Sequence, residues 1–420
     1  GACSLLLGTR SALFTPMPRL GLIILDEEHD SSFKQQEGFR FSARDVAIMR
    51  GKFAQTPVLL GSATPSLESL YNIRQARYHH LPLPERAGSA LPPIVEIIDI
   101  RQQKLNEGLS PILLNEMRLT LNKDEQVLLF LNRRGFAPTL ICNDCGWVAR
   151  CVHCDANLVI HRHKSLLRCH HCGTEHRLIQ TCPACQTHNL VSVGLGTERI
   201  ESVLGTLFAD KTVIRLDRDS TSHKGALERY LTQIHAGDAH IILGTQLLAK
   251  GHHFPNVTLV AILDVDSGLF STDFHSGEKL AQLIVQVSGR AGREQKQGKV
   301  ILQTRQPEHP LLVELLRDGY SKFAALALQE RERAKLPPFS YQALLRAHSA
   351  SEVLPENFLQ SVAALAKTLN ASNVQILGPI PAPMARRAGQ YRYQLLFQHD
   401  NRNGLHHLLR QLVPKISGLN

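Results

Sequence analysis

Cysteine pairs are the feature of this sequence that most restricts how it can fold. Eight of the nine cysteines form four Cys-x-x-Cys pairs in one stretch: Cys142 and Cys145, Cys151 and Cys154, Cys169 and Cys172, and Cys182 and Cys185. A Cys-x-x-Cys turn directs two thiolates at one tetrahedral metal ion, so four pairs predict two zinc sites of four thiolates each. Disulfides are the alternative, but the sequence shows no export signal, and a reducing compartment disfavours them.

The spacing of the pairs suggests how they are shared between two ions. The inner pairs flank the segment NLVIHRHKSLLR, which is typical of the two-stranded hairpin of a zinc ribbon. We therefore assign the inner pairs to one ion and the outer pairs, Cys142, Cys145, Cys182 and Cys185, to the other. Sequential pairing is the alternative. Because thiolates fill both coordination shells, we expect structural rather than catalytic zinc.

Apolar strands that end in polar loops recur along the rest of the chain. LGLIIL runs into DEEH, TPVLL into GSATPS, and IILG into TQLLAKG. Helical patterns separate these strands, an order that is typical of a parallel α/β sheet with functional loops at its carboxyl edge.

Charge and hydropathy narrow the class of protein. The 420 residues carry a formal net charge of +10, which suggests an anionic partner, although an incidental basic surplus would give the same sum. Apolar runs are far shorter than the ~20 residues that span a bilayer. The chain begins at Gly1, without a methionine and inside a folded-looking pattern, so we expect a piece of a longer protein.

The polar loops fall in the order of helicase motifs. DEEH, GSATPS, GTQLLAKG and QVSGRAGR resemble the Walker B motif and motifs three, five and six of superfamily 2 helicases. The four Cys-x-x-Cys pairs narrow this resemblance to the PriA family of primosomal replication-restart helicases. Further segments that support it are GTRSALF, FLNRRGFAP, GLGTERIE, RLDRDST, GTQLLAKGHHFP and LPPF.

This resemblance implies roles for individual residues. Asp26 would hold Mg²⁺, and Glu27 would orient and deprotonate the attacking water. Arg290 and Arg293 would stabilise charge on the transferred γ-phosphate. Residues expected to bind the nucleotide or to couple its hydrolysis to DNA are Glu28, His29, Ser62, Thr64, Gly251, Gln286 and Gly289. Residues of motif five expected to contact DNA are Thr245, Gln246 and Lys250.

The segment SSFKQQEGFRFSARD, directly after the acids, alternates aromatic with basic residues. Aromatic rings stack on bases and basic groups pair with phosphates. The segment resembles an aromatic-rich loop that reports bound DNA to the ATP site in the PriA family, although its aromatic positions often carry Trp and Tyr there. The expected DNA contacts are Phe33, Lys34, Phe39, Arg40, Phe41 and Arg44. The alternative is that the phenylalanines are buried core residues.

The expected architecture is an α/β fold of RecA-like helicase lobes with an inserted two-zinc module and a small α+β C-terminal domain. Residues 1–85 would be the remainder of the first lobe, and residues 94–335 the second lobe with motifs four to six. The zinc module would occupy residues 140–190. Residues 337–420 would form the C-terminal domain, which we expect to be incomplete.

One part of a nucleotide site has no counterpart in this sequence. Acids that hold a nucleotide metal work with a phosphate cradle, GxxxxGK[ST]. The Gly-Lys pairs here, 51–52 and 298–299, lack the preceding glycine and the following Ser or Thr.

Two classes of function therefore stay open. For the intact protein the resemblance implies an ATP-dependent 3′→5′ DNA helicase that binds stalled or forked DNA and promotes primosome assembly, with ATP, Mg²⁺ and two Zn²⁺ as cofactors. For this chain alone, the alternative is a non-enzymatic module that binds DNA or docks a partner. An RNA helicase is a weaker third alternative. The implied partners are forked and single-stranded DNA, single-strand-binding protein and other primosome proteins, in the bacterial cytoplasm at the nucleoid and its replication forks.

Overall fold

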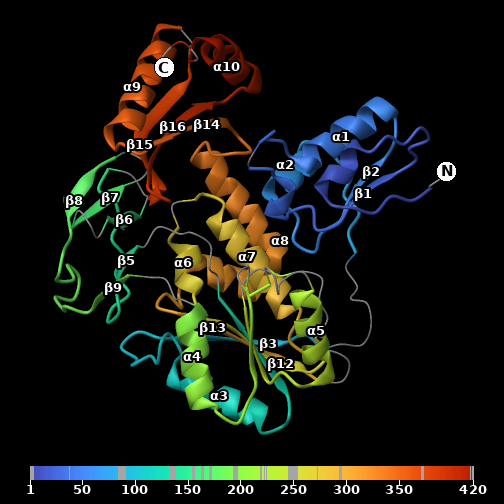
Figure 1. Cartoon of the computed structure of the whole chain (residues 1–420), viewed down its shortest axis with the longest axis vertical. Coiled ribbons are helices and arrows are strands. Elements are labelled where there is room, and N and C mark those ends of the chain that lie inside the picture. Colours follow the sequence, from blue (N-terminus) through green and yellow to red (C-terminus); the bar gives the residue numbers. More distant parts are fainter. Residues whose placement is uncertain are drawn as a thin grey trace. The chain divides into compact units, whose positions relative to one another are not determined.

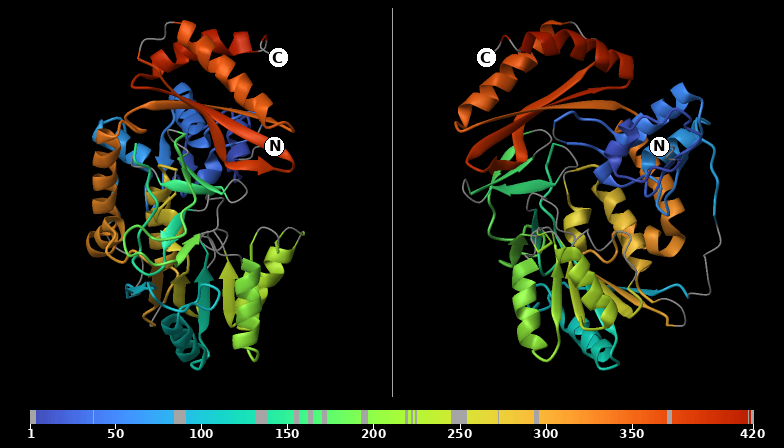
Figure 2. Two further views of the ribbon diagram at one scale, coloured as in Figure 1. Left: turned by 90° about the vertical axis from the view of Figure 1, so that its left-hand side faces the viewer. Right: turned by 45° about the vertical axis from the view of Figure 1, so that its right-hand side comes forward.

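The protein was examined as a computed structural model (Figures 1 and 2). It describes residues 4–36, 38–83, 91–131, 139–153, 157–161, 165–169, 173–192, 197–217, 220–221, 223, 225–244, 254–271, 273–292, 296–369, 373–416 and 418. The chain divides into two compact units, Gly1–Leu81 and Pro82–Asn420. The division lies close to residue 85, where the first lobe was expected to end. Among the described residues, no helix has both the length and the apolar character needed to cross a membrane.

The first unit is built around a short parallel strand pair. Its elements are η1 (Arg10–Phe14), β1 (Ile23–Leu25), η2 (Ser31–Phe33), α1 (Ala43–Ala54), β2 (Val58–Leu60) and α2 (Leu67–Arg74). Strands β1 and β2 pair in parallel from Ile23 with Val58 to Leu25 with Leu60. Ala47 of α1 is fully buried against Ile23 and Leu25. The side chain of Ser42 caps α1 by accepting the amide hydrogen of Asp45.

A six-stranded parallel sheet forms the centre of the second unit. Its order is β10-β11-β4-β12-β13-β3, and every pairing is parallel. The bounds are β3 (Ile94–Asp99), β4 (Gln126–Phe130), β10 (Val213–Leu216), β11 (Ile241–Gly244), β12 (Val257–Ile262) and β13 (Lys299–Thr304). Every residue of β4, β11 and β12 is buried, as expected for strands covered on both faces. The predicted parallel sheet is confirmed.

Helices cover both faces of this sheet (Figure 1). They are α3 (Pro111–Leu121), α4 (Thr197–Leu207), α5 (Ala226–Ala236), α6 (Val265–Leu269), α7 (Ser276–Ser288) and α8 (Pro310–Arg333). The main core includes Met117 of α3 and Leu204 of α4, packed against Leu129 of β4.

A buried ion pair joins α7 to the end of α8. Arg331 Nη2 lies 2.7 Å from Glu278 Oε2, and each side chain is only 6% exposed. The Arg331 guanidinium also lies over the Phe274 ring, 5.1 Å from its centroid, and donates to the carbonyl oxygen of Pro337. This pair therefore fixes the segment through which the chain passes from the sheet to its C-terminal part.

Two small sheets form the cysteine module. Strand β5 (Leu140–Cys142) pairs antiparallel with β9 (Leu190–Ser192). Strands β6 (Leu158–His161), β7 (Leu166–Cys169) and β8 (Glu175–Arg177) form an antiparallel sheet. The expected ribbon hairpin is confirmed as β6 and β7, and β8 extends it.

The C-terminal part is a three-stranded antiparallel sheet under two helices. Strands β14 (Tyr341–Ser349), β15 (Gln375–Arg387) and β16 (Gln390–His399) lie in the order β14-β16-β15. Helices α9 (Val353–Thr368) and α10 (Arg402–Ile416) pack on one face of this sheet, over Leu395 and Phe397 (Figure 2). This arrangement agrees with the α+β character expected of the C-terminal part.

Candidate functional site

The first two acids of DEEH lie directly after β1 and face solvent. Asp26 and Glu27 are both exposed, and the amide of Glu27 donates to Asp26 Oδ1 at 3.0 Å. Glu27 has a φ of 50°, so the chain turns sharply at this residue. Hydrogen bonds from the Gly61 amide to the Leu25 oxygen and from the Glu28 amide to the Gly61 oxygen hold this turn against the end of β2. The two carboxylates are thus presented together at the carboxyl edge of the strand pair.

The other two residues of DEEH contact the second polar loop. The imidazole Nδ1 of His29 lies 2.7 Å from Ser62 Oγ and 3.5 Å from Glu27 Oε2. Ser62 Oγ also accepts the amide hydrogen of Thr64 at 2.9 Å. The DEEH and GSATPS segments, both expected to act on the nucleotide, are therefore joined by a hydrogen bond between side chains.

Glu28 points inward and is 3% exposed. Its carboxylate accepts from the amide of Ser66 at 2.6 Å, from Ser69 Oγ at 3.0 Å and from Arg44 Nη1 at 2.8 Å. Arg44, which was expected to contact DNA, therefore forms an ion pair inside the first unit. No local sequence pattern indicates this pair, because Arg44 and Glu28 are brought together only by the packing of α1.

The aromatic-rich segment is divided between core and surface. Phe33 packs against the core of Ile23 and Leu25, so the core alternative describes this residue better than base stacking does. Phe39 is 77% exposed, and its ring centroid lies 6.0 Å from that of Phe41. Phe41 in turn contacts Phe14 edge to face at 5.0 Å. Lys34 and Arg40 are exposed, as a DNA contact requires.

Motifs five and six belong to the second unit. Thr245, Gln246, Lys250, Gly251 and Arg293 lie outside the described residues, after β11 and after α7. The last turn of α7 carries Gln286, and Gly289 and Arg290 follow the helix.

The segment that follows α7 lies at the amino edge of the sheet. Its Gly292 amide donates to the oxygen of Val257, the first residue of β12. This differs from the expectation that functional loops gather at the carboxyl edge. The reason is that α7 runs antiparallel to the strands and returns the chain to where β13 begins.

Because Gly298 has no side chain, the backbone before β13 can pass close to the backbone of Ala291 and Gly292. A Cβ at Gly298 would lie 2.2 Å from the carbonyl carbon of Ala291 and 2.4 Å from the amide nitrogen of Gly292. We expect Gly298→Ala to displace the segment after Arg290 and to lower the free energy of unfolding by about 1–3 kcal/mol, the usual cost of overpacking. Chemical denaturation would measure the change.

Gly205 supplies the matched control for this prediction. It is exposed in α4, and a Cβ there would meet nothing within 4 Å. Gly205→Ala should therefore leave stability unchanged or raise it by up to about 1 kcal/mol, since alanine favours helix. Equal losses for both variants would contradict the steric explanation.

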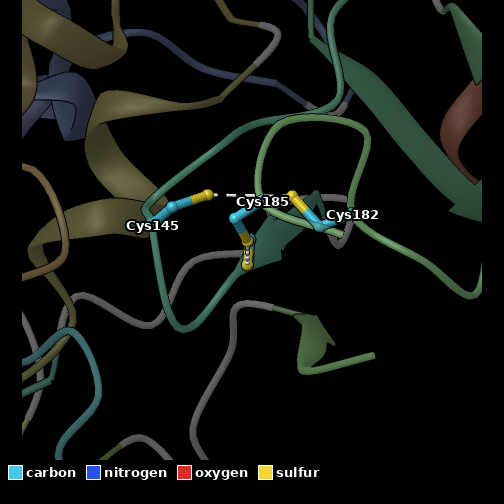
Figure 3. A group of neighbouring side chains, drawn as sticks. Cys145, Cys182 and Cys185 are labelled. Carbon is cyan, nitrogen blue, oxygen red and sulfur yellow. Dashed lines mark hydrogen bonds between the residues drawn. The ribbon is translucent and has the colours of Figure 1, made fainter. Parts of the chain in front are cut away.

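The outer cysteine pairs come together in one cluster. The Sγ atoms of Cys142, Cys145, Cys182 and Cys185 all lie within 4.8 Å of one another. The Sγ–Sγ distance is 3.6 Å for Cys142 and Cys185, and 3.7 Å for Cys145 and Cys182 (Figure 3). Four convergent sulfurs fit a tetrahedral zinc ion.

The inner pairs are described in part. Cys151 and Cys169 are buried in the module, whereas Cys154 and Cys172 lie outside the described residues. The Cys169 turn nevertheless repeats the backbone pattern of Cys142 and Cys182. At each of the three, the cysteine oxygen accepts from the amide four residues on, and the cysteine amide donates to the oxygen five residues on. This recurrence supports a second metal-binding turn at Cys169.

Two thiols of the outer cluster have pKa values that are shifted in opposite directions. The hydroxyl and amide of Thr187 lower the pKa of Cys185 to about 6, which favours the thiolate. Burial, with hydrogen bonds to the neighbouring thiols, raises the pKa of Cys145 to about 12, so a metal ion must displace that proton.

The loop of the first cysteine pair is fixed to the large sheet by residues that sequence analysis did not identify. Arg305 Nε donates to the side-chain Oδ1 of Asn143 at 2.9 Å. The backbone amide of Gln102 donates to the backbone carbonyl oxygen of Asn143 at 3.0 Å. Arg305 is held in turn by the buried Asp266, 3.3 Å from its Nη1. These partners are far from Asn143 in sequence, so no local pattern could have indicated them.

Three family models match parts of the chain. A Primosomal protein N C-terminal domain matches residues 332–418, a PriA DNA helicase Cys-rich region domain matches residues 151–177, and a Helicase conserved C-terminal domain matches residues 184–295. Together with the parallel sheet and the cysteine module, these matches assign the chain to the helicase class of proteins, with an inserted cysteine-rich region.

Relatives specify the family. The chain is 52% identical to "Replication restart protein PriA" of Haemophilus influenzae over 98% of its own length and 56% of the relative. It is 40% identical to the protein of the same name from Bacillus subtilis, over 97% of its own length and 51% of the relative. Across the length that it spans, the chain belongs to the PriA family. That length is about half of these curated relatives.

Solved structures give only distant likenesses. Saccharomyces cerevisiae Dbp5 bound to RNA and ADP BeF3 has a TM-score of 0.38 at 14% identity, covering 72% of this chain and 57% of that one. The DUF1998 helicase MrfA bound to DNA and AMPPNP has a TM-score of 0.38 at 12% identity, covering 72% of this chain and 33% of that one. Neither likeness is close enough to carry an argument about ligands.

Proposed function

We propose that the protein containing this chain is an ATP-dependent 3′→5′ DNA helicase that binds stalled or forked DNA and promotes primosome assembly. The observation that carries the proposal is the 52% identity to a replication restart protein over 98% of the chain. The exposed acids after β1, joined to the second polar loop through His29 and Ser62, agree with it.

In this proposal the two exposed acids after β1 act on the bound nucleotide. Asp26 holds Mg²⁺ directly or through water, and Glu27 orients and deprotonates the attacking water. Gln286, Gly289 and the arginines of motif six, Arg290 and Arg293, bind the phosphates of the nucleotide. Thr245, Gln246 and Lys250 contact the DNA strand, and Gly251 couples that contact to the nucleotide.

The remaining parts of the proposal concern ligands and partners. Zn²⁺ occupies the outer cysteine cluster and a second site at the inner pairs, and it supports the fold. The protein acts in the bacterial cytoplasm at replication forks on the nucleoid, on forked and single-stranded DNA. It works with single-strand-binding protein and other primosome components.

ATP turnover stimulated by forked DNA is the decisive measurement. In the intact protein with Mg²⁺, Glu27→Gln should lower the stimulated rate by about 10²–10⁴-fold, because a general base is lost. Glu107→Gln is the matched control: Glu107 is also exposed and also has a positive φ, of 45°, but lies in a turn before α3. It should change the rate by less than about twofold, as is usual for a surface substitution.

Other outcomes would contradict parts of the proposal. Turnover that is equal in both variants would remove Glu27 from catalysis. Stimulation by an RNA duplex that exceeds stimulation by forked DNA would favour an RNA helicase.

A non-enzymatic module is the second candidate for this chain by itself. The supporting observation is that GxxxxGK[ST] does not occur in its 420 residues. For the chain as given we expect no DNA-stimulated turnover but retained binding to forked DNA. Clear turnover by this chain alone would mean that another segment cradles the phosphates.

A further inference from the structure

Three polar side chains follow one another along one face of α7. Glu278, Gln282 and Gln286 are spaced four residues apart, so they lie one above the other on the helix. Glu278 is 6% exposed and Gln282 is 5% exposed. Gln286 is the first residue of QVSGRAGR, the segment that resembles motif six. The row therefore runs from the buried start of α7 to motif six.

Two side chains of α8 bind the first two members of this row. Helices α7 and α8 lie side by side, and α8 leaves helical geometry at Gly319, where φ is 78° and ψ is 177° (Figure 1). Tyr320 follows directly, and its Oη accepts from Gln282 Nε2 at 3.3 Å. Arg331 forms the buried ion pair with Glu278. Gln282 Nε2 also lies 3.4 Å from Glu278 Oε1, so the two contacts form one buried network.

A buried hydrogen-bonded network fixes two helices more strictly than apolar packing does. Apolar side chains can repack when a helix shifts, at a modest cost. Polar atoms in a low-dielectric interior must each keep a partner at a defined distance, and a lost partner is costly. Helix α7 therefore cannot slide or rotate on α8 without breaking hydrogen bonds of the network.

Motif six continues the last turn of α7 without an intervening loop. The amide of Gly289 donates to the oxygen of Val285, and the amide of Arg290 donates to the oxygen of Val287, both at 3.0 Å. The position of α7 thus determines where the backbone of Arg290 lies, and with it where the guanidinium can reach.

We propose that Gln282 and Tyr320 are positioning residues, which hold α7 so that Arg290 meets the transferred phosphate of the nucleotide. The inference rests on the proposed helicase function and deepens it, because it names residues outside motif six that determine how fast the phosphate is transferred. A group misplaced by about 1 Å at a reacting centre can cost about 10²-fold in rate, so a small shift of α7 is sufficient.

The test separates the catalytic rate from nucleotide binding in the intact protein. Gln282→Met keeps a side chain of similar length and removes its hydrogen bonds. With saturating ATP and forked DNA, kcat should fall at least about tenfold, whereas KM for ATP should change less than about twofold, because Arg290 acts on charge that develops in the transition state. The affinity for ADP with aluminium fluoride, which imitates that state, should fall with kcat. The affinity for ADP alone should not change.

Gln303→Met is the matched control. Gln303 is also fully buried, and its amide group donates to the oxygen of Gly108 at 2.8 Å and accepts from the amide of Ser110 at 2.9 Å, at the start of α3. This variant should lower the melting temperature but leave kcat within about twofold, because its hydrogen bonds hold a different helix.

A second comparison tests whether Gln282 acts through Arg290. In an Arg290→Met background, Gln282→Met should cause little further loss of kcat, because two substitutions that act through the same group are not additive. Losses that add in full would mean that Gln282 acts by another route, and would overturn the inference.

The remaining outcomes are also decisive. An unchanged kcat in folded Gln282→Met would overturn the inference, and so would an equal loss of kcat in Gln303→Met. A raised KM at constant kcat would overturn it too, since that pattern indicates a role in binding the ground state. If Gln282→Met does not fold, Tyr320→Phe carries the test, because it removes a single hydroxyl group and should lower kcat at constant KM. Absence of DNA-stimulated turnover in the unsubstituted protein would instead refute the proposed function, and the inference with it.

Discussion

Replacing Cys182 by serine should lower the zinc content of the freshly purified chain from about two ions to about one. Cys182 is fully buried, and its Sγ lies 3.7 Å from that of Cys145, so serine removes one of four convergent ligands. Elemental analysis of the purified protein would measure the change. Cys3→Ser is the control, because Cys3 is the one cysteine outside the four pairs, and it should retain both ions.

The loss of this ion should also unfold the β5–β9 strand pair of the module. Structural zinc contributes apparent binding free energies of about 10–16 kcal/mol in small zinc domains, far more than one short strand pair can replace. Hydrogen exchange should therefore accelerate in β5 and β9, while the buried strands β4 and β12 stay protected. Zinc near zero in the unsubstituted protein, or unchanged exchange in Cys182→Ser, would contradict the metal assignment.

Arg331→Met should lower the free energy of unfolding by about 3–5 kcal/mol, the usual cost of leaving one partner of a buried pair unpaired. The charge that remains is Glu278, which is 6% exposed. Arg333→Met, on the exposed face of the same helix, should change stability by less than about 0.5 kcal/mol. Chemical denaturation of the chain would measure both.

A double variant distinguishes the ion pair from simple packing. Glu278→Gln combined with Arg331→Met removes both charges, so it should be less destabilised than the sum of the two single variants. Additive losses would mean that Arg331 acts mainly through its contact with Phe274 and through filling space. The comparison therefore tests the interaction between the two charges, and not only the contribution of Arg331.

Sequence patterns were sufficient to predict a strand or hairpin where the segment's own residues determine its structure. The apolar run IILG before TQLLAKG indicated a strand of a parallel sheet, and the structure has it as the buried strand β11. NLVIHRHKSLLR indicated a hairpin because its apolar residues lie between two cysteine turns, and β6 and β7 confirm it. In the C-terminal part, the sheet β14–β16 with helices α9 and α10 agrees with the α+β character expected from the sequence.

Patterns were insufficient where a contact depends on packing between distant segments. Basic residues beside phenylalanines suggested DNA contacts, but sequence cannot show that Arg44 pairs with Glu28 or that Phe33 packs on Ile23. β3 lies beside β13, although most of the second unit separates them in sequence. The polar loop after α7 lay at the unexpected edge of the sheet because a helix, not a strand, precedes it.

Few positions of a cysteine turn need a particular type of residue. At Cys142, Cys169 and Cys182 the turn is closed by backbone hydrogen bonds, so the residues between the two cysteines are not specified by it. The further requirement is a residue four positions on that tolerates a positive φ, here Gly146, Gly173 or Gln186. A module built from such units can vary at most of its positions during evolution and still present its sulfurs in the same geometry.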